Sequence, residues 1–124
     1  MLEITRELVE HYLRATGWRF DQNNGLGWWL GTDASGNEGR GFPASWLPAS
    51  GLDADVAARM AGHRVNAVTL AFRLGLCAAA EEIRLDAESQ GTLYAERALN
   101  GGHNRLLMSA GIDPAAWESA RGSR

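Results

Sequence analysis

Apolar residues near the start of the chain recur every three or four positions, which is the spacing of one face of an α-helix. The polar residues of this stretch fall on the opposite face. Thr5 can cap the start of such a helix, and Gly17 can end it. The pattern therefore predicts an amphipathic helix over residues 5–16, with these residues along its buried face: Ile4, Leu8, Val9, Tyr12 and Leu13.

After this helix the apolar residues alternate with polar residues or glycine, which is the period of a half-buried strand. A two-residue turn at residues 24–25 would set Phe20 opposite Trp29, whereas a three-residue loop at residues 23–25 would set Phe20 opposite Trp28. We predict the three-residue loop, because it gathers the alternating apolar residues on one face of a strand pair. These residues are Trp18, Phe20, Leu26, Trp28 and Leu30.

A short third strand is predicted over residues 38–42, and Pro43 would confine it to an edge of the sheet. Residues 48–51 have the composition of a linker to a helical half. Asp53 can cap a helix over residues 54–61.

A long helix is predicted from about residue 66 to residue 88, with Asn66 as its cap. Its first half is apolar over most of its circumference, and it becomes charged only from Glu81 onwards. A helix of this kind is buried in a core or covered by a partner. We expect one row of this helix to be buried, broadened by Leu70, Leu74 and Cys77; the row is Val68, Phe72, Leu76, Ala79 and Ile83.

Three more helices follow in the pattern. One is predicted over residues 92–99 and would be stopped by Asn100-Gly101-Gly102, and the next over residues 103–110 would be stopped by Gly111. Asp113-Pro114 predicts the start of a last short helix, because an acidic cap followed by proline suits a first turn.

These elements together predict a single α+β domain spanning residues 1–124. Residues 1–48 would hold an N-terminal helix and a small antiparallel sheet of two or three strands. Residues 52–121 would form a C-terminal helical half of three to five helices.

The composition narrows the possible functions. All 12 basic residues are arginine, so enzymes that depend on a lysine are excluded, such as those with a P-loop or a Schiff base. With the abundant alanine and glycine, this bias suggests a high-GC bacterium or its phage. A single cysteine and the absence of a signal-like or membrane-spanning stretch lead us to expect a cytoplasmic protein that does not bind membranes.

No residue set in the sequence has the spacing of a metal, cofactor or catalytic site. His11, His63 and His103 lack metal-type spacing, and Cys77 lies in an apolar run that suits a core residue. The acidic residues Glu81, Glu82, Asp86 and Glu88 are interleaved with an arginine, which favours a solvated helix end. An enzyme with an unfamiliar site around Glu81 and Glu82, or around His103, is our third hypothesis.

Four of the five tryptophans lie between residues 18 and 46. Adjacent strand residues point to opposite faces, so Trp28 and Trp29 cannot both enter one core. In the predicted register Trp29 lies on the outer face opposite Arg19, where it would stack on the guanidinium or anchor a partner. The predicted partner-binding residues are Trp29, Phe42, Trp46 and Arg19.

Residues 57–73 resemble a bacterial helix-turn-helix, with Gly62 at the turn and Val68 and Phe72 on the inward side of the second helix. The resemblance implies that four residues face DNA. It is weakened by His63 after the glycine and by a net charge of −3 without a basic patch. The four residues are Arg64, Asn66, Thr69 and Arg73.

We therefore expect a small non-enzymatic protein that acts by protein–protein interaction. A phage or prophage accessory protein, such as an anti-CRISPR-like inhibitor of host defence, is the specific form that the composition suggests. A DNA-binding regulator that uses residues 57–73 is the alternative. No cofactor is expected, and the sequence does not identify the protein partner.

Overall fold

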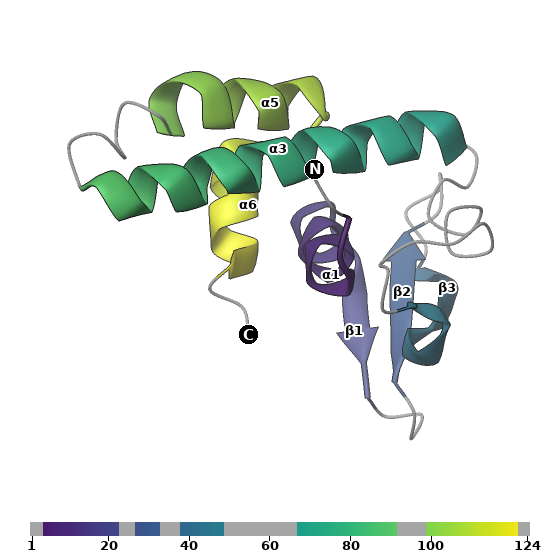
Figure 1. Cartoon of the computed structure of the whole chain (residues 1–124). Coiled ribbons are helices and arrows are strands. Elements are labelled where there is room, and N and C mark those ends of the chain that lie inside the picture. The colour runs from purple at the N-terminus through teal and green to yellow at the C-terminus, as the bar shows by residue number, and fades with distance from the viewer. Residues whose placement is uncertain (1–3, 23–26, 33–37, 49–66, 92–98, 122–124) are drawn as a thin grey trace.

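A computed structural model describes five stretches of the chain: residues 4–22, 27–32, 38–48, 67–91 and 99–121. The N-terminal helix is followed by a three-stranded antiparallel sheet and then by further helices (Figure 1). The predicted α+β fold is therefore confirmed. The predicted helix over residues 54–61 lies outside the described residues.

Helix α1 covers Arg6–Ala15 and is bounded as its sequence predicts. The Thr5 hydroxyl accepts a hydrogen bond from the amide of Leu8 at 3.2 Å, which caps the first turn. Gly17 follows the helix with a φ of +95°, a left-handed conformation that glycine adopts without strain. The predicted apolar face is turned inward, with four buried residues: Leu8, Val9, Tyr12 and Leu13.

The sheet has the strand order β1-β2-β3, with β1 at Arg19–Asp21, β2 at Trp28–Thr32 and β3 at Glu38–Pro43. Both strand pairs are antiparallel. The third strand therefore exists, lies at an edge and ends at proline, as predicted. A 3-10 turn, η1 at Ala44–Trp46, follows it directly.

The predicted register of the first strand pair is wrong by one residue. Phe20 pairs with Trp29 rather than with Trp28, and Leu30 pairs with Arg19. This is the register that the two-residue turn would give, although the turn itself lies outside the described residues. The one-residue shift exchanges the two faces of β2, so Trp29 is buried and Trp28 is only half-buried.

Two glycines are required by the packing that accompanies this register. Gly27, directly before β2, and Gly31 of β2 lie two positions before and after Trp29 and therefore on the same face as its side chain. A Cβ at Gly31 would lie 2.9 Å from the Trp18 ring, and one at Gly27 would lie 2.6 Å from the Phe20 ring. The glycines therefore make room for the aromatic rings of the neighbouring segment on either side of the central tryptophan.

Helix α3 covers Ala67–Gln90, close to the predicted range. The prediction of its buried face is wrong: Val68 and Phe72 are exposed, and Leu76 and Ile83 are only partly buried. The row predicted to broaden the core provides its centre instead, because the buried residues of α3 are Leu70, Leu74, Cys77, Ala78, Ala80 and Ala87.

The chain after α3 is described again from a π-helical turn, η2 at Leu99–His103. The predicted helix over residues 92–99 lies outside the described residues apart from Leu99. Gly101 and Gly102, which were predicted to stop it, lie within the π turn, which continues directly into α5 at Asn104–Ser109. Gly111, with a φ of +78°, does follow the end of α5.

Helix α6 covers Pro114–Arg121 and begins as predicted. The Asp113 carboxylate accepts a hydrogen bond from the amide of Ala115 at 3.1 Å, which caps the first turn. Trp117 of α6 is fully buried.

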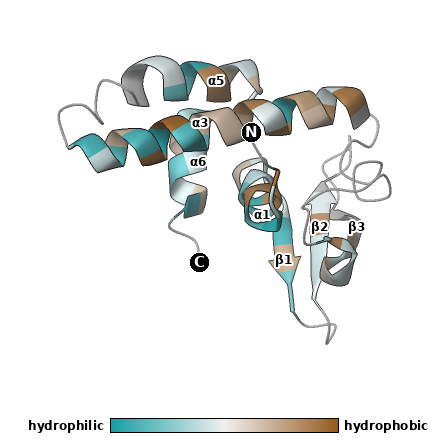
Figure 2. Ribbon diagram, viewed as in Figure 1, coloured by the Kyte–Doolittle hydropathy of each residue, from teal (hydrophilic) through white to brown (hydrophobic). Residues whose placement is uncertain are grey.

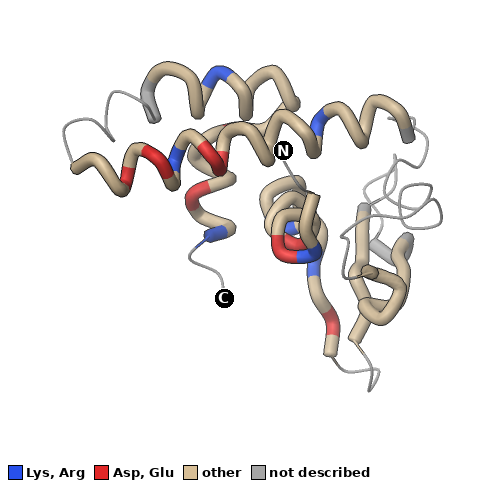
Figure 3. Tube along the Cα trace, viewed as in Figure 1, with Lys and Arg blue, Asp and Glu red and all other residues tan. Residues whose placement is uncertain are grey.

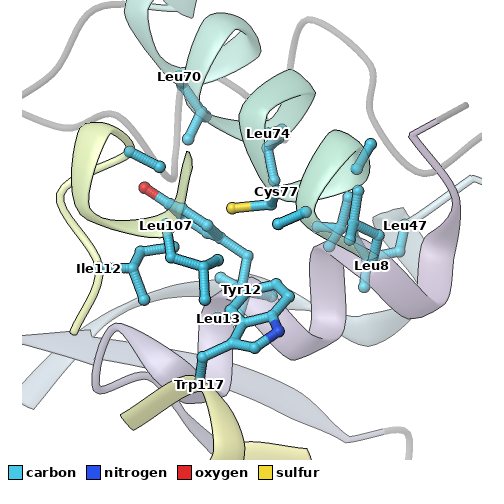
Figure 4. Packing of buried hydrophobic residues seen from close by; sticks show 14 of the residues in the cluster. Leu8, Tyr12, Leu13, Leu47, Leu70, Leu74, Cys77, Leu107, Ile112 and Trp117 are labelled. Carbon is cyan, nitrogen blue, oxygen red and sulfur yellow. The ribbon is translucent and has the colours of Figure 1, made fainter. Parts of the chain in front are cut away.

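One hydrophobic cluster joins the sheet to the helices (Figure 4). Trp29 and Phe42 come from the sheet, Leu13 from α1 and Trp117 from α6. Helix α3 runs across the molecule between α5 on one side and α1 and α6 on the other (Figure 1). This arrangement leaves the side chains of Val68 and Phe72 on α3 exposed.

Candidate functional site

Two of the predicted partner-binding residues lie in the core. Trp29 is 1% exposed and Phe42 is fully buried, and the two are paired across β2 and β3. The Trp29 ring packs against Phe20, with ring centroids 5.2 Å apart. The cation over its indole is Arg14 of α1, at 5.3 Å, and not Arg19 as predicted. Neither aromatic residue can therefore anchor a partner while the protein is folded.

The other two predicted residues remain at the surface. Trp46 is 40% exposed in η1, and Arg19 is exposed on β1 opposite Leu30. With the corrected register, the aromatic residue on the outer face of β2 is Trp28, which is half-buried. The outer face of the sheet thus has apolar residues that are only partly exposed. The four predicted partner-binding residues do not form one surface, because two lie in the core and two at the surface.

The helix-turn-helix resemblance required Val68 and Phe72 to point inward. Both are exposed, so the second helix does not present the face that the resemblance implies. Arg73 is half-buried beside Tyr12, and Thr69 is also half-buried. The other two residues predicted to face DNA, Arg64 and Asn66, lie outside the described residues.

A polar cluster joins α3 to α6. The Glu81 carboxylate accepts a hydrogen bond from the indole nitrogen of Trp117 at 2.8 Å and another from the Arg121 guanidinium. Arg84 binds Glu88 at 3.0 Å and also contacts Glu118 of α6. Of the predicted acidic group, Glu81 and Glu88 are therefore paired with arginine in this cluster.

The electrostatics of Glu81 fit a structural role. Burial alone would raise the pKa of this carboxyl, but the hydrogen bonds from Arg121 and Trp117 outweigh it and hold the pKa below its ordinary value. A carboxylate that stays ionised and has two donors is poorly suited to donate or accept a proton at neutral pH. We infer that the cluster stabilises the packing of α3 against α6.

His11 belongs to the same junction. Its ring stacks on Trp117 with centroids 3.7 Å apart, and its Nε2 donates to the Trp117 carbonyl at 2.8 Å. Burial lowers the pKa of His11, and the hydrogen bond to the Trp117 carbonyl opposes this shift only in part. Burial thus favours the neutral form of His11, which packs as part of the fold.

Two further candidates for chemistry, His103 and Cys77, are also buried, whereas Glu82 is exposed and His63 lies outside the described residues. His103 is buried, and its Nδ1 lies 2.9 Å from the Oδ1 of Asn104. Burial, together with the nearby Glu81, raises the pKa of the Cys77 thiol to about 12, so no reactive thiolate forms at neutral pH. Among the residues that the structure describes, no three histidines, cysteines or carboxylates gather to hold a metal ion.

An exposed apolar stripe on α3 is the surface feature that sequence reasoning missed. Val68 is 80% exposed and Phe72 is 65% exposed, one helical turn apart. The exposed Ala71 and the half-buried Gly75 lie beside them. Apolar colour dominates this half of the helix in Figure 2. The sequence shows two apolar rows on this helix, and only its packing against α1, α5 and η2 decides which row is buried.

Within the described part of the chain, no helix combines the length and the hydrophobicity needed to cross a bilayer. Comparisons with protein-family models, with curated proteins and with solved structures give no match for this chain, so its surface and chemistry provide the argument for function.

Proposed function

We propose that this chain is a small non-enzymatic protein that acts by binding another protein, and that the apolar stripe of α3 is its binding surface. The observation that carries the proposal is the pair Val68 and Phe72, which expose 80% and 65% of their surface on neighbouring turns. Single exposed apolar residues are common on soluble proteins, but contiguous ones mark interaction sites.

The energetics of the pair support this proposal. Exposing a large aromatic side chain forgoes about 2 kcal/mol of burial free energy, so folding alone gives no reason for phenylalanine at position 72. The same side chain covered by a partner would recover that free energy. Aromatic residues that become buried at the centre of an interface carry much of its binding energy.

Leu85 shows what an isolated apolar residue on the same helix looks like. It is 65% exposed, the same fraction as Phe72. Its neighbours one turn away are polar or charged: Glu81, Glu82, Glu88 and Ser89. Leu85 therefore has the exposure of Phe72 without an apolar residue one turn away on the helix, and it provides a matched control.

The lysine-free, alanine-rich composition supports a more specific form of the proposal. We propose a phage or prophage accessory protein of a high-GC bacterium, acting as an inhibitor of a host defence complex in the manner of anti-CRISPR proteins. Small size and the lack of a recognised catalytic residue set suit a protein that acts by occupying a surface of its target.

Affinity capture from a lysate of a high-GC bacterium tests the proposal with three baits: the wild-type chain, Phe72→Glu and Leu85→Glu. We expect a protein that the wild type and Leu85→Glu retain and that Phe72→Glu loses. The loss should be about 30-fold in affinity, the effect of removing about 2 kcal/mol at an interface. Equal capture by both variants would show that the stripe is not the binding surface.

A further inference from the structure

The exposed face of α3 has the spacing of a helix-pairing seam. Six residues recur at intervals of four and three along it, which is the pattern by which one helix contacts another over several turns. None of the six belongs to the buried core. In chain order they are Val68, Phe72, Gly75, Ala79, Glu82 and Asp86, and we refer to them as the α3 seam.

The seam changes character along its length. Its first four positions are apolar or small, and Gly75 leaves space above it, because a Cβ there would meet no atom within 4 Å. A bulky side chain of a partner helix therefore fits beside Phe72 and over Gly75. Close approach of a second helix is easiest where the facing residues are small.

The last two seam positions are acidic. Glu82 and Asp86 are both exposed, and Figure 3 shows the acidic residues gathered in this half of α3. The arginines of the described helix do not lie on the seam: Arg84 contacts Glu88 and Glu118, and Arg73 lies beside Tyr12. The negative end of the helix dipole lies at the same end of α3 and adds to its preference for a cation.

A second copy of this chain does not match the whole seam. In an antiparallel pair aligned over all six positions, Phe72 would face Glu82 of the other copy and Val68 would face Asp86. In a parallel pair, each acidic residue would face its own equivalent. The first arrangement places apolar residues against carboxylates, and the second places like charges together.

We propose that the α3 seam binds a basic amphipathic helix of a partner protein. The partner would present apolar side chains to the first four seam positions and arginine or lysine to Glu82 and Asp86. This inference rests on the proposed function and adds the chemistry of the partner to it. The recognition is that of an amphipathic helix on a complementary helix face.

Fluorescence anisotropy with two labelled synthetic helical peptides tests this inference. Both peptides carry leucine at the positions that face the apolar seam, and they differ only in having arginine or glutamate at the two positions that face Glu82 and Asp86. We expect the arginine peptide to bind the wild-type chain about fivefold more tightly, the effect of two exposed ion pairs. The difference should shrink in about 0.5 M salt.

Variants of the chain identify which part of the inference holds. The double variant Glu82→Arg/Asp86→Arg should reverse the preference for the two peptides. Phe72→Glu should weaken the binding of both peptides by about 30-fold. Leu85→Glu should leave the contribution of Phe72 to peptide binding intact.

Each contrary result has a distinct meaning. Equal affinity for the two peptides would overturn the charge preference and leave the proposed binding surface standing. Failure of both peptides to bind would overturn the helical partner, even if Phe72-dependent capture of a protein from lysate succeeded. A dimer in analytical ultracentrifugation that Phe72→Glu dissociates would make a second copy the occupant and also overturn the inference.

Discussion

Replacing Trp29 with alanine should destabilise the protein far more than replacing its neighbour Trp28. The indole of Trp29 is 1% exposed and packs against Phe20 and beneath Arg14, so its removal leaves a large cavity. Truncation of a buried aromatic residue costs about 3 to 5 kcal/mol. The indole nitrogen of Trp29 has no hydrogen-bond partner among the described residues, so truncation also removes an unsatisfied polar group. We therefore expect the lower end, about 3 kcal/mol.

Trp28 is half-buried on the outer face of the sheet, so Trp28→Ala should cost about half as much, 1 to 2 kcal/mol. Urea unfolding followed by far-UV circular dichroism measures both variants without relying on tryptophan fluorescence. With a slope of about 1.5 kcal/mol per molar, Trp29→Ala should lower the midpoint by about 2 M. A larger loss for Trp28→Ala would refute the register and return Trp29 to the surface.

Three further predictions follow from the packing and the polar cluster. In thermal melting, Leu74→Ala should lower the free energy of unfolding by about 3 kcal/mol, and Phe72→Ala should lower it by less than about 0.5 kcal/mol. The opposite order would mean that Phe72 is buried, as the sequence predicts. Because burial lowers the pKa of His11, this histidine binds a proton more readily in the unfolded chain, so the free energy of unfolding should fall as pH drops below 6.5. His11→Gln should remove this part of the dependence of stability on pH, and an unaltered dependence would argue against the prediction. Glu81→Gln should lower the free energy of unfolding by about 1 to 2 kcal/mol at pH 7, because it weakens the hydrogen bonds from Trp117 and Arg121. In the wild type, the stabilisation from the Glu81 carboxylate should be lost as pH falls below 4.5 and then through the lowered pKa of Glu81. An equal cost of the substitution at pH 7 and in strong acid would contradict this prediction.

The sequence predicts well where local chemistry decides the structure. Thr5 and Asp113 accept the backbone hydrogen bonds expected of helix caps, and Gly17 and Gly111 adopt the left-handed conformation that follows a helix. These features depend on a few neighbouring residues, so they form independently of how the helices and the sheet pack together. The order of helix, sheet and helices follows from the same local signals.

The orientation of elements could not be predicted in the same way. Helix α3 has apolar residues on nearly all sides of its first half, so hydrophobic spacing alone does not select the buried face. The selected face contains Leu74 and Cys77, and on the same side Glu81 meets Trp117 and Arg121, which are distant in sequence. Contacts between residues more than 30 positions apart leave no local sequence pattern from which the buried face of α3 could be predicted.

The error in the sheet has a related cause and carries over to the site. Sorting side chains into apolar and polar classes treats Gly27 and Gly31 as markers of the outer face, but they provide space for aromatic rings on the inner one. Because faces alternate along a strand, that choice moved Trp29 from core to surface in the prediction. The exposed stripe of α3 was missed for the converse reason, since Val68 and Phe72 suit a core.

Site-specific photo-crosslinking in a lysate of a high-GC bacterium tests the proposed binding surface most directly. A benzophenone amino acid placed at position 72 or at position 85 gives two probes with the same exposure on the same helix. The α3 seam predicts one discrete crosslinked protein from position 72 and none from position 85. Crosslinking of the same protein from both positions, or of none from position 72, would contradict the account.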